Sequence, residues 1–240
     1  MLARAQAAGV ECILTIGNGT SIEEFRRSLT LSDAAPGIWV ALGVHPHQAH
    51  HTTPALLAAL KSLARAPRVL AWGEIGLDYH YNRSPHAIQR TVFREQLRLA
   101  GELGLPVIIH CREAWGECLE IIEQEWAPTG LGDILHCFSG TANEAVRART
   151  WKFLISFAGN LTFPRAASLR EIARATPLEH LLTETDCPYL APQVYRGQRN
   201  EPAFVREVAA ELGRLKGLPV EVIGEVTTEN FLRLFPRART

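Results

Sequence analysis

Short apolar runs rich in β-branched residues recur along the whole chain, and they are near-continuously apolar rather than alternating. They occupy residues 11–16, 38–42, 68–72, 106–110, 133–137, 152–157 and 180–185. A strand that is buried on both faces, as in a parallel sheet, has this pattern. The sequence therefore predicts seven strands of a parallel sheet.

The segments between these runs carry apolar residues at helical spacing. They cover residues 54–65, 86–103, 113–126, 141–149, 166–175, 201–215 and 219–233. Ser84 and Pro85 suit the N-cap and first turn of the helix over 86–103. Strand followed by helix, repeated, indicates βαβ units with right-handed crossovers. Both a doubly wound sheet and a closed barrel fit this order, although a closed barrel of this type has eight strands.

Length and composition narrow the class of protein. A chain of 240 residues with 47% hydrophobic and 21% charged residues suits one globular domain over residues 1–240. The formal net charge is zero, which excludes a globally basic nucleic-acid binder and leaves local phosphate binding at a site. Five cysteines without a CxxC pair, no signal-like start and no membrane-length apolar run predict a cytoplasmic protein with reduced thiols.

Five of the predicted strands lead into histidine, glutamate or aspartate. These residues are His45, Glu74 with Asp78, His110, His136, and Glu184 with Asp186. The carboxyl ends of parallel strands meet at one face, so their side chains converge there. Imidazole and carboxylate together are ligands for Zn²⁺ or Mn²⁺, whereas carboxylate and water favour Mg²⁺. The sequence therefore predicts a divalent metal site.

Each of these residues also has a structural interpretation. A single histidine at a strand end is as readily a hydrogen-bonded structural residue as a ligand, so the metal site rests on Glu74, His110, His136 and Asp186 jointly. His45 begins a His-Pro turn, and we favour a role in the site. We expect His47 to be solvated. Asp78 and Glu184 suit supporting or capping roles.

At these residues the sequence resembles the TatD family of metal-dependent hydrolases. The main matching motifs are GVHPH at 43–47, GEIGLDYHY at 73–81, PVIIHCREA at 106–114, HCFSG at 136–140 and TETDCPYLAP at 183–192. The match covers nearly the whole chain in the right order. The resemblance implies a TIM-like (β/α) barrel and a divalent-metal-dependent deoxyribonuclease or related phosphodiesterase. It also implies metal ligands at Glu74, His110, His136 and Asp186, with His45 near the substrate.

The family pattern opens with a first strand that carries a His-x-His pair, and this sequence has no counterpart of it. We therefore expect an N-terminally truncated chain that lacks the first strand, because a barrel without it exposes the edges of its neighbours. The ligands Glu74, His110 and His136 are retained. One well-held cation is expected, with a second position weak or empty.

The expected reaction is hydrolysis of a phosphodiester bond by metal-activated water, with single-stranded DNA or DNA ends as the substrate. Glu74 takes part as a ligand, and Asp186 orients the water and acts as general base. His45 and Arg112 are expected to hold phosphate oxygens. Neither a membrane nor an obligate protein partner is predicted.

Two other functions stay open. A small-molecule amidohydrolase or lactonase could use the same ligands on the same barrel, but such enzymes often bridge two metals with a carbamylated lysine. Lys61, Lys152 and Lys216 do not lie at the end of any predicted strand. The second possibility is a catalytically impaired barrel that binds nucleic acid, which the missing ligand pair favours. A doubly wound nucleotide-binding fold is disfavoured, because neither GxGxxG nor GxxxxGK[ST] occurs.

Overall fold

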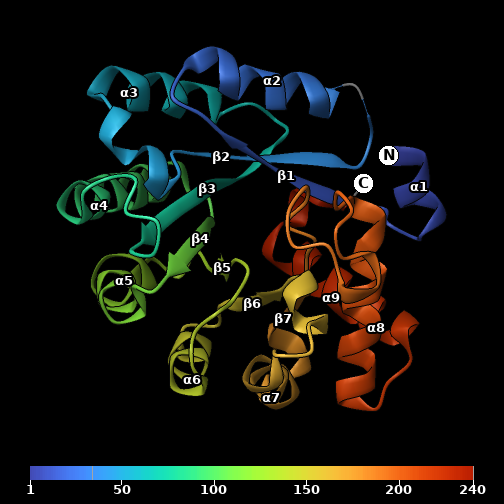
Figure 1. Ribbon diagram of the computed structural model, residues 1–240. Coiled ribbons are helices and arrows are strands. Elements are labelled where there is room, and N and C mark those ends of the chain that lie inside the picture. Colours follow the sequence, from blue (N-terminus) through green and yellow to red (C-terminus); the bar gives the residue numbers. More distant parts are fainter. Residues whose placement is uncertain (34, 240) are drawn as a thin grey trace. The chain divides into compact units, whose positions relative to one another are not determined.

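The computed structural model describes residues 1–33 and 35–239 (Figure 1). The chain divides into two compact units, and each is described by itself. The first, here called the β1–β5 unit, comprises residues 12–135 together with the chain end from Arg237. The second, the β6–β7 unit, comprises residues 1–11 and 136–236.

The β1–β5 unit is a parallel sheet whose strands follow one another in sequence order. Its strands are β1 (Ile13–Asn18), β2 (Ile38–Gly43), β3 (Val69–Asp78), β4 (Val107–Arg112) and β5 (Asp133–Leu135). Between them lie α2 (Ile22–Asp33), α3 (Pro54–Leu63), α4 (His86–Leu103) and α5 (Trp115–Ile121), the last continued by a π-helical turn over Ile122–Trp126. Every residue of β2 and β3 is buried, which accounts for their unbroken apolar pattern.

The β6–β7 unit contains a parallel strand pair and five α-helices among its described residues. The elements are α1 (Leu2–Ala7), α6 (Ala142–Thr150), β6 (Leu154–Phe157), α7 (Ala167–Ala175), β7 (Leu181–Thr183), α8 (Val205–Lys216) and α9 (Val220–Leu234). Arg4 in α1 donates to Glu201 across a separation of 197 residues, with Nε 2.8 Å from Oε1. This ion pair ties the start of the chain to the segment that leads into α8.

The predicted seven strands and seven helices are all present. Most ends shift by a few residues, but the strand predicted over 68–72 extends to Asp78 as β3 and includes Glu74. Two details differ. Helix α2 was not predicted, and Ser84 does not cap α4: its hydroxyl donates to the carbonyl of His47 and accepts from the backbone N–H of His50. No disulfide bond is formed by the cysteines of the described residues. No helix among the described residues is long and apolar enough to cross a membrane.

Glycines allow strands β2, β3 and β4 to approach closely. A Cβ on Gly43 would lie 2.8 Å from the Cα of Gly73, and one on Gly73 would lie 2.9 Å from the backbone nitrogen of Ile108. Gly76 has a φ of +140°, and a Cβ there would lie 2.0 Å from the carbonyl oxygen of His110. Only glycine fits such a conformation and spacing. The motif glycines thus hold β3 and β4 in the register that pairs Gly76 with His110.

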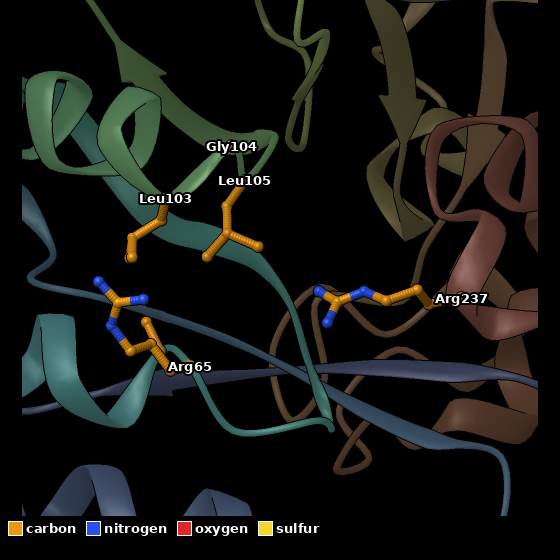
Figure 2. Close-up of a pocket in the computed structure, with 6 residues that line it drawn as sticks. Arg65, Leu103, Gly104, Leu105 and Arg237 are labelled. Carbon is orange, nitrogen blue, oxygen red and sulfur yellow. The ribbon is translucent and has the colours of Figure 1, made fainter.

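A cavity of about 310 Å³ lies in the β1–β5 unit at the amino ends of β3 and β4 (Figure 2). Its lining residues are Ala64, Arg65, Leu103, Gly104, Leu105 and Arg237. These residues sit at the opposite end of the strands from Asp78 and Arg112. Sites of parallel α/β proteins are built at the carboxyl ends, so this cavity is not the predicted site.

Candidate metal centre

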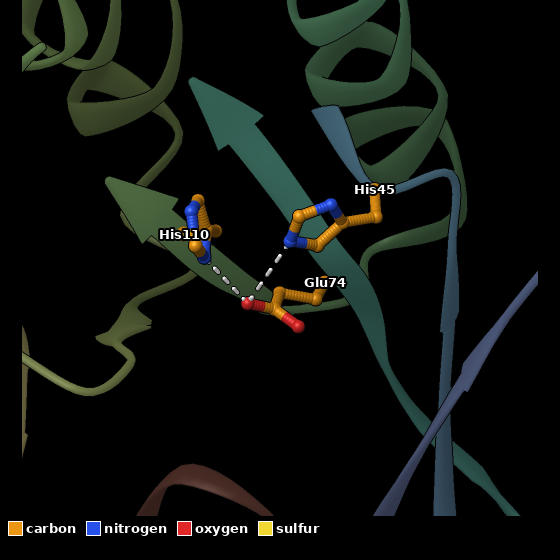
Figure 3. A group of neighbouring side chains, drawn as sticks. All are labelled: His45, Glu74 and His110. Carbon is orange, nitrogen blue, oxygen red and sulfur yellow. Dashed lines mark hydrogen bonds and ion pairs between the residues drawn. The ribbon is translucent and has the colours of Figure 1, made fainter. Parts of the chain in front are cut away.

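Three side chains of the β1–β5 unit converge on one point, as Figure 3 shows. His45 follows β2, Glu74 lies in β3 and His110 lies in β4. One ligand atom from each lies within 4.8 Å of the other two. Glu74 Oε1 is 2.8 Å from His110 Nδ1 and 3.7 Å from His45 Nε2. Two imidazoles therefore face a single carboxylate.

The position of Glu74 follows from an irregularity in the strand pairing. Gly73 pairs with Ile108 and Ile75 pairs with Ile109, so Glu74 is the extra residue at a shift in register. A bulge of this kind re-aims a side chain and is frequent beside active sites. The local backbone thus directs the Glu74 carboxylate toward His45 and His110.

Burial favours the neutral form of His45. Glu74 is only 8% exposed. Burial lowers the pKa of His45 to about 3, although the nearby Glu74 carboxylate opposes this shift. The neutral imidazole is the form that binds metal ions. A buried carboxylate with two imidazoles is a donor set that suits Zn²⁺ or Mn²⁺, so the residues of this cluster fit a divalent cation.

Asp78, at the end of β3, contacts the ring of His110 on the side away from Glu74. It is fully buried, and its Oδ2 lies 2.9 Å from His110 Nε2 and 2.9 Å from His47 Nε2. Its Oδ1 accepts from the backbone N–H groups of His80 and Tyr81. Burial raises the pKa of Asp78, but the hydrogen bonds from both histidines and from Tyr81 outweigh burial and lower it overall. An ionised Asp78 accepts Nε2–H from His110 and leaves Nδ1 facing Glu74, which is how outer carboxylates orient metal-binding histidines.

The β6–β7 unit contains a second set of polar side chains, in which a histidine again lies between two carboxylates. His136 follows β5, and its Nδ1 lies 3.0 Å from Glu184 Oε2. Ser156 in β6 donates to the same oxygen at 2.6 Å. His136 Nε2 lies 3.6 Å from Asp186 Oδ1. Glu184 therefore orients His136 so that its other nitrogen faces Asp186.

The structure brings the predicted residues together in two groups. Glu74 lies with His110 in one unit, and His136 lies with Asp186 in the other. His45, expected at a substrate phosphate, lies beside Glu74 and His110 as a third possible ligand. The binding of one cation by all four predicted ligands stays a prediction.

Arg112, expected to bind phosphate, is the last residue of β4. Its guanidinium carbon lies 4.8 Å from the centre of the Tyr81 ring. Its Nη1 lies 3.4 Å from the Tyr81 hydroxyl. Both contacts are within the β1–β5 unit and join the end of β4 to the loop that follows Asp78.

Several supporting residues were not found from the sequence. The expectation that His47 is solvated was wrong, because its side chain is 19% exposed and is bound to Asp78. Gln96 is buried and bonds both backbone groups of Val44, just before His45. Gln89 does the same for Asp78. The available signal was the seven-residue spacing of the two glutamines, which puts them on the inward face of α4.

Comparison with known proteins supports the fold and shows the family. The model of the family described as TatD related DNase matches residues 1–236. YabD of Bacillus subtilis, described as an uncharacterized metal-dependent hydrolase, is 40% identical, over 98% of this chain and 91% of that protein. The 3'-5' ssDNA/RNA exonuclease TatD of Klebsiella pneumoniae is 36% identical, over 98% of this chain and 90% of that protein.

Solved structures give the same result. The crystal structure of YjjV, a TatD homologue from Escherichia coli, has a TM-score of 0.90 with 32% identity, over 98% of this chain and 90% of that chain. An amidohydrolase from Saccharomyces cerevisiae has a TM-score of 0.82 at 20% identity, over 98% of this chain and 91% of that chain, which shows likeness of fold. The predicted TIM-like barrel class is therefore confirmed. With parallel βα units, a His45–Glu74–His110 cluster and a family match over nearly its whole length, the chain belongs to the TatD family of metal-dependent hydrolases.

Proposed function

We propose that this protein is a divalent-metal-dependent phosphodiesterase that degrades single-stranded nucleic acid. The observation that carries the proposal is the cluster of His45, Glu74 and His110, in which a buried carboxylate and two partly buried imidazoles lie within 4.8 Å. The nucleic-acid substrate is supported by relatives that are named 3'-5' ssDNA/RNA exonuclease at 36% and 37% identity.

Glu74 and His110 are the proposed ligands in the β1–β5 unit, and His136 and Asp186 are those that the family motifs add. A divalent cation bound at Glu74 and His110 would supply an activated water and would polarise a phosphoryl oxygen. Asp78 fixes the ring of His110 through Nε2. Each proposed histidine ligand thus has an outer carboxylate, which raises its basicity and fixes its orientation.

The remaining residues act on the substrate and the proton. Asp186 is the proposed general base: its side chain is 29% exposed, so it can reach a water on the substrate side. Glu184 and Ser156 hold His136 in place. Arg112 carries a planar guanidinium that matches phosphate oxygens, and no carboxylate forms an ion pair with it among the described residues.

The test is hydrolysis of an end-labelled single-stranded oligonucleotide. We expect activity that disappears on chelation, returns with added Mn²⁺ and is absent in Glu74→Ala. Glu102→Ala, a glutamate on the exposed side of α4, is the matched control and keeps full activity. Full activity in Glu74→Ala or after exhaustive chelation would refute the proposal. Turnover of a lactone or dipeptide without turnover of the oligonucleotide would support the amidohydrolase alternative.

A further inference from the structure

We infer that Tyr81, Arg83 and Arg112 form a nucleotide platform beside the metal cluster, on which an unpaired base of the substrate stacks while the guanidinium groups contact its phosphates. This inference rests on the proposed function and names the part of the β1–β5 unit that selects single-stranded nucleic acid.

Tyr81 is fixed in position by the same residues that support the cluster. Its backbone N–H donates to Asp78 Oδ1 at 2.9 Å, and Asp78 Oδ2 bonds His110. The ring of His47 packs edge-on against Tyr81 with centroids 5.3 Å apart at 88°. Despite these contacts Tyr81 is 49% exposed, one of the few large apolar side chains at the surface. An aromatic ring is thus presented next to the proposed ligands.

Two arginines complete the platform. The guanidinium carbons of Arg83 and Arg112 lie over the Tyr81 ring, 5.4 Å and 4.8 Å from its centre, so that the planar guanidinium groups and the ring together offer stacking surfaces. Neither forms an ion pair with any carboxylate in residues 1–33 and 35–239. No carboxylate neutralises their positive charges within the described chain. Because the formal net charge of the protein is zero, attraction of phosphate groups depends on local positive charges such as these.

An exposed aromatic ring with adjacent guanidinium groups recognises single-stranded nucleic acid, because every base has a face that stacks and every linkage carries a phosphate. A base inside a duplex cannot reach a single ring in this way, so the platform favours unpaired strands. Stacking is tolerant of sequence, and the platform is therefore expected to discriminate strand type rather than base identity.

The experiment measures equilibrium binding of a labelled single-stranded oligonucleotide by fluorescence anisotropy, with cleavage recorded in parallel. We expect Tyr81→Ala to raise Kd by about 5- to 150-fold, the range for loss of one stacked base. Tyr81→Phe keeps the ring and binds like the wild type. A series of oligonucleotides, each with one abasic site at a different position, locates the stacked base. The wild type should bind one member of the series more weakly than the others, whereas Tyr81→Ala should bind all members alike.

The arginines have a matched control. Arg83→Ala should weaken binding and flatten its dependence on salt. Arg65→Ala removes the same charge from an exposed arginine at the amino ends of the strands and should leave binding unchanged (Figure 2). Equal binding by the wild type and Tyr81→Ala, on intact and abasic strands alike, would overturn the platform. Failure of the wild type to cleave any strand that it binds would instead refute the proposed function.

Discussion

Asp133 is a buried acid without a compensating partner, and we predict that it makes the stability of the fold depend on pH. It opens β5, is 0% exposed, and neither carboxylate oxygen has a hydrogen-bond partner among the described residues. Burial raises its pKa well above the usual value, and the neighbouring Cys118 adds to the shift. The folded protein therefore holds Asp133 in its protonated form at pH values where the unfolded chain has already ionised it.

The sign and the size follow from proton linkage. The stability that the protonated carboxyl allows is fully present below the unfolded pKa of about 3.9, and it is lost as pH rises toward the raised pKa of the folded state. Within that window one proton changes the free energy of unfolding by about 1.4 kcal/mol per pH unit. Asp133→Asn keeps the size and polarity of the side chain but binds no proton. As pH rises through this window, the free energy of unfolding of Asp133→Asn should therefore increase relative to that of the wild type by up to about 1.4 kcal/mol for each pH unit.

The assay is urea unfolding of metal-free protein, followed by tryptophan fluorescence at a series of pH values from mildly acidic to neutral. The difference between the two proteins is the informative quantity, because every other titrating group, Asp78 included, contributes equally to both. Asp133→Ala also removes the unsatisfied oxygens, whose burial costs about 1–3 kcal/mol. Parallel stability curves for the wild type and Asp133→Asn would mean that folding does not raise the pKa of Asp133, contrary to this prediction.

Further predictions concern the support of the proposed ligands. Gly76→Ala should destabilise the fold and weaken Mn²⁺ binding, because its Cβ would lie 2.0 Å from the His110 carbonyl oxygen. Thermal unfolding and calorimetric titration measure the two effects. Gly116→Ala is the control, because a Cβ at Gly116 meets no atom within 4 Å. Glu184→Gln should lower metal affinity by about 10- to 100-fold, since it weakens the hold on His136. Unchanged affinity in either variant would contradict the role given to that residue.

Much of the fold could be predicted because strands β2, β3, β5 and β6 are buried on both faces. Runs such as 38–42 and 68–72 are continuously apolar, and β2 and β3 are buried along their whole length. Helix α2 was missed, although Ser21 and Glu24 carry a capping signal: the Glu24 carboxylate accepts from the backbone N–H of Ser21 and the Ser21 hydroxyl accepts from that of Glu24. Only Phe25 and Ser32 of α2 are buried, so its apolar stripe is thin.

The site could be predicted only in part, for a physical reason. Glu74 and His110 were identifiable, because strand ends of a parallel sheet meet at one face. The bulge that turns Glu74 toward His45 depends on strand pairing, which a sequence pattern does not record. The bond from His47 to Asp78 likewise joins residues that lie 31 positions apart. Supporting contacts of this kind arise from tertiary packing and not from local preference.

Calorimetric titration with Mn²⁺ measures whether Glu74 holds a divalent cation. Glu74→Gln preserves the size of the side chain and removes the carboxylate that faces His45 and His110. We predict that the wild type and the surface control Glu102→Gln bind Mn²⁺ alike, and that Glu74→Gln loses more than about 100-fold in affinity, since even outer partners contribute about 10- to 100-fold. Equal Mn²⁺ affinity in Glu74→Gln and the wild type would contradict the account.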